Sequence, residues 1–246
     1  MEGHSQSESI KSQFAMVHGS AGEAPRVMGI LKAFWPLLVI STLLGYLIRE
    51  ALPFSFLSLS QVGIAFIFLS IIGVVLLTIG DKKLSNYLKG AKGEESVLRE
   101  LTFLSSEYTI FNGIRLDNGR YNFDHIVVGP SGVFVIETKN WNGHVQFLDG
   151  EVQIDGKKIN FSPINQVKGE ASELSNFFDT HNMPLFSIKT VLCFVDSKLD
   201  ESISNVNGVI VCNKSSLRNV LTLDLNDEID INIQNKTNNL LLSLLD

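Results

Sequence analysis

The hydrophobic pattern is dominated by two apolar tracts near the N-terminus. Only Arg49 and Glu50 interrupt a run that is otherwise free of Asp, Glu, Lys and Arg between residues 33 and 80. A bilayer core about 30 Å thick requires about 20 apolar residues per helix. The pattern therefore predicts two transmembrane helices, at about 30–48 and 57–79. Its alternative is a pair of buried core helices.

Basic residues mark one side of the two predicted spans. Six of them flank the spans away from the intervening turn: Arg26, Lys32, Lys82, Lys83, Lys89 and Lys92. The turn itself carries only Arg49. Lys and Arg near the end of a span resist translocation and stay on the cytoplasmic side. The sequence therefore predicts an integral protein of the inner or plasma membrane with both termini in the cytoplasm.

The segments around the spans differ in composition. Residues 1–28 are rich in Ser, Gly, Glu and His and are predicted to form a flexible cytoplasmic tail. Residues 81–92 are rich in Lys and are predicted to form a basic linker. The remaining residues, 93–246, suffice for one domain with a proper core. Cys193 and Cys212 lie in apolar runs, so reduced core thiols are expected.

The part of the chain that follows the spans is acidic. From Asp81 onward it holds sixteen Lys or Arg and twenty-two Asp or Glu, which accounts for the whole net charge of −6. Affinity for nucleic acid duplexes depends on neutralisation of phosphates by Lys and Arg. The composition therefore argues against tight unspecific binding, and an anionic inner leaflet would add to the repulsion.

Apolar periodicity predicts an α/β domain after the linker. Apolar residues at helical spacing predict helices over 94–104 and 163–178. Short helices are expected near 215–221 and 240–244. Apolar runs bounded by turn residues predict strands at 108–114, 123–128, 132–138, 143–148, 151–154, 188–195 and 206–212.

Charged residues follow one strongly apolar strand. Residues 133–136 are apolar on both faces and lead into Glu137 and Lys139. Because these two are two positions apart, their side chains point to the same side of a strand. If the preceding hairpin turns symmetrically about residues 130–131, Asp124 lies opposite Glu137. Two carboxylates and one ammonium group are thus predicted to gather at one strand end.

This trio suits a divalent cation. Two adjacent carboxylates repel each other, which raises one pKa unless positive charge lies between them. Carboxylate oxygens favour Mg²⁺ or Mn²⁺. Lys139 could then position the attacking water or stabilise charge on a phosphate. The alternative for Asp124, Glu137 and Lys139 is a structural ion pair, because their spacing alone is a loose pattern.

Glu94 is a further candidate ligand. On a helical wheel it lies on the face made by Val97 and Leu101, so its carboxylate is predicted to point inward and could complete the metal site. The alternative is an acidic residue that the helix dipole favours in a first turn.

Four blocks of residues add a resemblance to a known family. They are Gly93-Glu94-x-x-Val97, Phe123-Asp124-His125-Ile-Val-Val128, Gly132-Val-Phe-Val-Ile-Glu137-Thr-Lys139-Asn140-Trp141-x-Gly143 and Pro163-x-x-Gln166. In order and spacing they resemble the NERD (nuclease-related) domain family over about 90–215. That family is regarded as a branch of the restriction-endonuclease-like PD-(D/E)xK superfamily. The resemblance implies a restriction-endonuclease-like mixed sheet flanked by helices, preceded here by the transmembrane hairpin.

The resemblance also implies roles for five residues. Asp124 and Glu137 would be metal ligands, and Lys139 would be the catalytic lysine. Glu94 matches the acidic residue of the first helix. Gln166 matches the glutamine that opens the following helix, where its alternative is an ordinary solvated residue.

Three neighbouring residues need separate interpretation. Phe123 stands where the superfamily's name has proline, a residue that the family commonly lacks. Trp141 is interpreted as a core residue, with a base-stacking platform as the alternative. His125 points away from Asp124 by strand alternation and is interpreted as structural.

We therefore expect a nuclease that hydrolyses phosphodiester bonds of DNA, with RNA as the other candidate, by metal-assisted attack of water. The alternative is a catalytically silent module of the same fold that acts as a membrane-tethered nucleic-acid-binding or signalling domain. The expected partners are nucleic acid and the lipid bilayer. The two spans leave pairing with further copies of the chain open.

Overall fold

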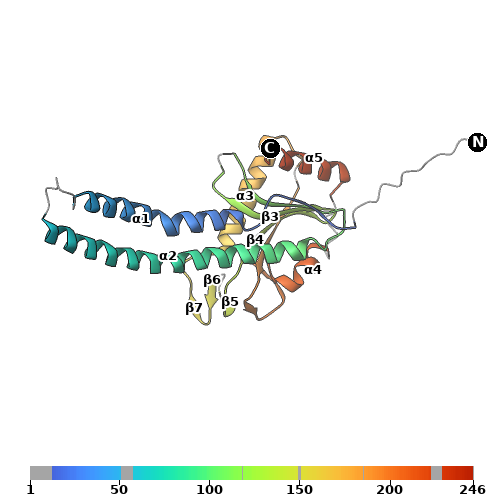
Figure 1. Cartoon of the computed structure of the whole chain (residues 1–246). Coiled ribbons are helices and arrows are strands. Elements are labelled where there is room, and N and C mark those ends of the chain that lie inside the picture. The colour runs from blue at the N-terminus through green and yellow to red at the C-terminus, as the bar shows by residue number, and fades with distance from the viewer. Residues whose placement is uncertain are drawn as a thin grey trace, which may run out of the picture. The chain divides into compact units, whose positions relative to one another are not determined.

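The computed structural model describes residues 13–50, 58–117, 119–148, 151–184, 186–222 and 229–245. The chain divides into two compact units, which are described separately (Figure 1). One unit is Gly22–Lys92, and the other combines Met1–Ala21 with Gly93–Asp246.

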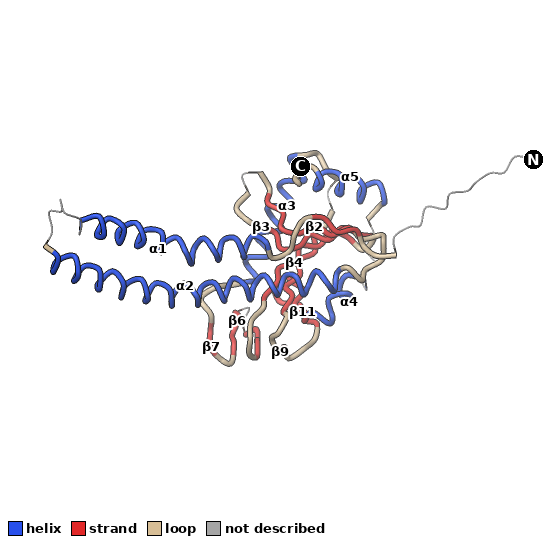
Figure 2. The backbone as a smooth tube through the Cα atoms, viewed as in Figure 1, coloured by secondary structure: helices blue, strands red, loops and turns tan. Residues whose placement is uncertain are grey.

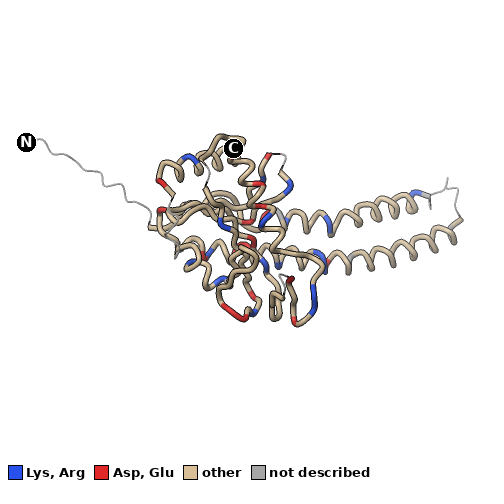
Figure 3. Tube along the Cα trace, turned by 180° about the vertical axis from the view of Figure 1, so that it is seen from behind, with Lys and Arg blue, Asp and Glu red and all other residues tan. Residues whose placement is uncertain are grey.

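Two long helices make up the first unit. They are α1 (Glu23–Glu50) and most of α2 (Leu59–Leu101), and Figure 3 shows long stretches of both without charged residues. By length and composition, Pro25–Arg49 and Ser60–Leu101 could each cross a membrane. Most of their large apolar side chains are exposed. The two helices are therefore candidate membrane spans, in line with the predicted pair.

A seven-stranded sheet forms the centre of the second unit (Figure 2). In spatial order its strands are β1 (Met16–His18), β2 (Thr109–Arg115), β3 (Asn122–Gly129), β4 (Gly132–Lys139), β8 (Ile188–Phe194), β11 (Val209–Asn213) and β10 (Ile203–Val206). The pairs β2–β3, β3–β4 and β10–β11 are antiparallel, whereas β1–β2, β4–β8 and β8–β11 are parallel. The sheet is mixed, as predicted.

Helices cover both faces of this sheet. They are the end of α2, α3 (Pro163–Thr180), α4 (Leu217–Thr222) with the preceding short helix η1 (Lys214–Ser216), and α5 (Ile231–Leu242). Val133 and Val135 of β4 join a core cluster with residues of α3 and α5. Phe134 and Ile136 join a second cluster with residues of α2 and α4. Strand β4 is therefore buried on both faces, as its unbroken apolar run predicted.

The second unit also contains a separate, four-stranded sheet. Its strands, in order, are β7 (Lys157–Lys158), β6 (Glu151–Ile154), β5 (His144–Leu148) and β9 (Lys198–Leu199). The sequence predicted β5 and β6 but not the two-residue strands β7 and β9, which are too short to have a pattern.

The predicted strand 206–212 is wrong in one respect. The structure splits this region between β10 and β11, which form a hairpin. Asn207 and Gly208 connect them with φ of 53° and 82°. Asn and Gly tolerate such positive φ values, and a two-residue turn of this kind matches the twist of the strands. The Asn-Gly pair is thus a hairpin turn within an apolar run.

Two further segments also differ from expectation. Residues 81–92, expected as a linker, are helical as part of α2. They lack Pro and continue an existing helix, so no new nucleation is required. Within the predicted tail 1–28, β1 is ordered by pairing with β2, and α1 begins at Glu23. Residues 1–12 of that tail lie outside the described residues.

A buried histidine connects three strands of the sheet. His125 of β3 is fully buried, and its Nδ1 lies 2.7 Å from Asn112 Oδ1 on β2. Asn112 Nδ2 in turn donates to the carbonyl oxygen of His18 on β1 at 2.9 Å. Burial lowers the pKa of His125 from 6.5 to about 3. The imidazole is therefore neutral in the fold at neutral pH and has a structural role.

The pKa of His125 predicts a loss of stability in acid. Between pH 6.5 and about 3 the unfolded chain binds a proton that the folded chain does not, so stability falls as the pH falls through this window. At about pH 5 the loss is on the order of 2 kcal/mol, or roughly 4–8 °C in melting temperature. Thermal unfolding of the full chain in detergent, compared near pH 7 and near pH 5, measures it. Equal acid sensitivity in His125→Gln and the unsubstituted protein would contradict this assignment.

Candidate active site

The hairpin of β3 and β4 has the predicted register. His125 pairs with Ile136, and Gly129 pairs with Gly132 across the turn. Asp124, which precedes His125, also contacts the end of β4: its Oδ2 accepts a hydrogen bond of 2.9 Å from the backbone N–H of Thr138. The side chain of Asp124 is thereby fixed against the end of β4.

Lys139 joins two of the predicted residues. Its Nζ donates to Glu137 Oε1 and, at 3.0 Å, to Gln166 Oε1. Glu137 is 3% exposed, so this ion pair is largely removed from water. Gln166 belongs to the first turns of α3, and Glu137 and Lys139 end β4. The ammonium group therefore lies between a strand end and a helix start.

Glu170 is a member of the cluster that the sequence analysis missed. It is fully buried on α3, and its Oε1 accepts a hydrogen bond of 2.8 Å from Gln166 Nε2. Burial, followed by the negative charge of Glu137, raises the pKa of Glu170 to about 9. The spacing held a signal, because Glu170 follows Val167 and precedes Leu174 on the apolar face of the helix. A carboxyl group on that face, one turn after Gln166, is unlike a solvated acidic residue.

The electrostatics bring Glu94 into the same region. Glu94, near the end of α2, is 8% exposed. Removal from water raises the pKa of Asp124 well above its usual value, and the charges of Glu137 and Glu94 raise it further. The Thr138 N–H and the Lys139 ammonium oppose this shift. The three predicted carboxylates are therefore close enough to perturb one another.

The donor chemistry at this cluster partly fits a divalent cation. Glu137 Oε2 and Glu170 Oε2 are buried, and the two carboxyl groups interact directly with each other. Such oxygens suit Mg²⁺ or Mn²⁺, which are bound through one or two carboxylates and retain water. Across the described ranges, however, no group of three or more Asp, Glu, His or Cys side chains is arranged to hold a metal ion. The ligand set Asp124, Glu137 and Glu94 stays a prediction.

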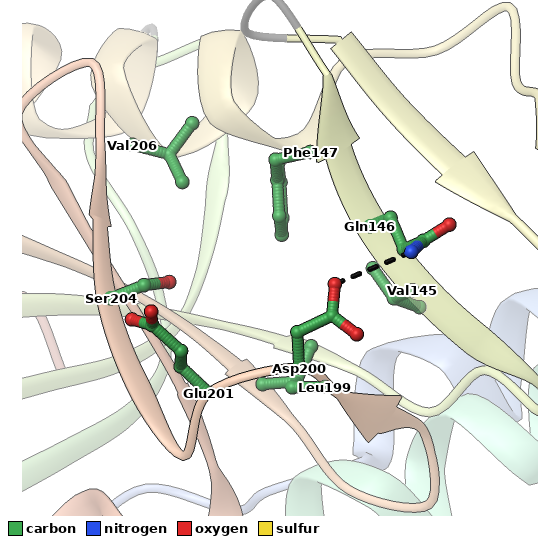
Figure 4. A pocket seen from close by; sticks show the side chains of 8 residues that line it. All are labelled: Val145, Gln146, Phe147, Leu199, Asp200, Glu201, Ser204 and Val206. Carbon is green, nitrogen blue, oxygen red and sulfur yellow. Dashed lines mark hydrogen bonds between the residues drawn. The ribbon is translucent and has the colours of Figure 1, made fainter.

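Trp141 and a separate hollow lie outside this cluster. The Trp141 ring packs on Phe194 with centroids 5.6 Å apart and contacts the core, in agreement with its interpretation as a core residue. A hollow of about 230 Å³ is lined by β5, β9 and β10 and contains none of the predicted site residues (Figure 4). Its Asp200 lies 2.6 Å from His144 Nε2 and accepts from Gln146 at 3.3 Å.

Comparison with known protein families supports the predicted resemblance over part of the chain. Residues 89–195 match the family model described as the nuclease-related domain, NERD. This range contains all five predicted site residues: Glu94, Asp124, Glu137, Lys139 and Gln166. No curated protein and no solved structure matches the chain. The predicted resemblance is confirmed, and a link to the PD-(D/E)xK superfamily is consistent with it. Over residues 89–195 this chain is therefore similar to the nuclease-related domain family, NERD.

Proposed function

We propose that this protein is a membrane-anchored, divalent-metal-dependent nuclease that hydrolyses phosphodiester bonds of DNA, with RNA as the second candidate substrate. The observation that carries the proposal is Lys139, which is held by Glu137 and Gln166 beside buried carboxylates within a nuclease-related domain. A cationic group fixed next to acidic oxygens is the arrangement that phosphate hydrolysis uses for charge stabilisation.

Each residue has a distinct part in the proposed reaction. Asp124 and Glu137, with Glu94, would hold Mg²⁺ or Mn²⁺. Such an ion, when bound, lowers the pKa of water and neutralises charge on the phosphate. Lys139 orients the attacking water or binds a phosphate oxygen through its ammonium group. Gln166 limits the directions in which that ammonium group can point.

The two candidate spans would anchor the domain at the cytoplasmic face of a membrane. Basic residues that flank them favour an anionic leaflet, whereas the domain's net negative charge disfavours random association with nucleic acid. The proposed enzyme therefore acts on nucleic acid that reaches the membrane and does not bind nucleic acid without specificity.

A second candidate is a silent module that binds nucleic acid or signals from the membrane. It is favoured by one observation: within the described part of the chain, acidic side chains are not gathered into a three-ligand site. The presence of Asp124, Glu137 and Lys139 together argues against it, because a module without catalysis has no need of all three.

Substitution of the site is expected to abolish metal-dependent cleavage. Labelled single-stranded DNA, duplex DNA and RNA are incubated with the full chain in detergent and Mg²⁺ or Mn²⁺. Asp124→Asn and Lys139→Ala should each lower the rate by about 100-fold or more, because they remove a metal ligand and a charge-stabilising group. Chelation by EDTA should stop cleavage altogether.

Lys198→Ala is the matched control, since this exposed lysine of β9 lies outside the carboxylate cluster. It should cleave like the unsubstituted protein. If the unsubstituted protein cleaves no substrate faster than Lys139→Ala does, the silent module is the better explanation.

Glu170 is expected to act as a positioning residue. Glu170 Oε1 accepts a hydrogen bond from Gln166 Nε2. This bond orients the amide of Gln166 so that Gln166 Oε1 faces Lys139. Glu170→Ala frees that amide and should lower kcat by about tenfold or more, with a smaller change in KM. Glu170→Gln keeps an acceptor at the same place and should restore most of kcat. Steady-state kinetics beside melting temperatures measure this, and an equal loss of kcat in both variants would refute the positioning role.

A further inference from the structure

An exposed aromatic ring lies beside the site lysine. Phe161 precedes Ser162, the N-cap of α3, and 51% of its surface is exposed. The Nζ of Lys139 lies 5.3 Å from the centre of its ring. Among the described residues, neither core cluster includes Phe161. Phe161 is thus half exposed and lies within cation–π distance of the site lysine.

The ring forms one wall of a hollow of about 360 Å³. The hollow lies between the β6–β7 hairpin, labelled in Figure 1, and the start of α3. Val152 lines it together with a set of polar side chains: Lys158, Asn160, Ser162 and Asn165. Its volume falls within the range of small-molecule sites, roughly 300–1,000 Å³.

The polar groups of the hollow suit the edge of a nucleobase. The amides of Asn160 and Asn165 offer both donors and acceptors, as base recognition requires. Lys158 is paired with Glu151 at 2.6 Å, so its charge is partly neutralised there. Lys157, beside it in β7, is exposed. The hollow thus combines an aromatic face, amide groups and the Lys158–Glu151 ion pair, with the exposed Lys157 nearby in the chain.

We infer that this hollow binds an unpaired nucleobase stacked on Phe161, next to the phosphate that Lys139 contacts. The inference rests on the proposed function and names its substrate class as single-stranded nucleic acid. In a duplex, each base is already stacked on both neighbours and its edge is paired. In a single strand, a base can turn outwards onto an aromatic side chain.

Binding of oligonucleotides in EDTA tests this inference without catalysis. Fluorescence anisotropy gives the Kd of the full chain in detergent for labelled oligothymidylate, for oligouridylate and for a DNA duplex of the same length. Stacking on an aromatic side chain contributes about 1–3 kcal/mol per base, so Phe161→Ala should weaken single-strand binding by about 5-fold to about 150-fold. Phe161→Trp should retain it, and duplex binding should change little.

Phe103→Ala is the matched control, because its ring is similarly exposed, at 59%, in the same unit of the chain. It should bind like the unsubstituted protein. An oligonucleotide that contains 2-aminopurine adds a direct readout: its fluorescence should be quenched by the unsubstituted protein and by Phe161→Trp, but not by Phe161→Ala.

Four results would overturn the inference. They are absence of single-strand binding by the unsubstituted protein, equal binding by Phe161→Ala and Phe103→Ala, equal loss in Phe161→Ala and Phe161→Trp, and equal loss for duplex and single strand. If the expected binding pattern appears but Mg²⁺ and Mn²⁺ support no cleavage, the base site stands and the proposed nuclease activity falls. If the protein cleaves nucleic acid but substitution of Phe161 does not change binding, the nuclease activity stands and the base site falls.

Discussion

Burial of negative charge at the end of β4 is the constraint on which the site depends. Glu137 is almost inaccessible to water, and its negative charge raises the pKa of both Asp124 and Glu170. The ammonium group of Lys139 compensates for one charge at most. Glu170 therefore tends to keep its proton in the absence of a further cation, and the pKa of Asp124 is raised in the same direction. A bound cation would lower the cost of ionising these two carboxyl groups.

This arrangement is possible because the residues come from elements that are themselves fixed by burial. The β3–β4 hairpin sets the spacing of Asp124 and Glu137 through its ladder, and both faces of β4 are covered. Helix α3 packs on one face through Val167 and Leu174, which places Gln166 and Glu170 over the strand end. A site built on such elements loses little entropy when it binds its ligand.

The sequence predicted the parts that depend on local pattern. Alternation and turn chemistry gave the β3–β4 register, and apolar length gave the two candidate spans. It did not predict Glu170, although the place of this residue on the apolar face of α3 held a signal, because its partners become known only once α3 is packed on the sheet. Phe161 was missed because an isolated apolar residue in a loop belongs to no periodic pattern. Its exposure depends on the tertiary structure. The split between β10 and β11 was missed because apolar residues surround Asn207 and Gly208.

Strand β1 carries a consequence for any shortened form of this protein. Its three residues cover part of the outer edge of β2, and Asn112 adds a side-chain bond to that contact. A fragment that begins after the candidate spans would lack β1, although it would keep every residue of the carboxylate cluster. The backbone groups of β2 would then be open to pairing with another molecule, which is a common cause of aggregation in sheet proteins. Strand β1, which precedes the two long helices in the sequence, thus covers an edge of the domain that follows them and favours its solubility.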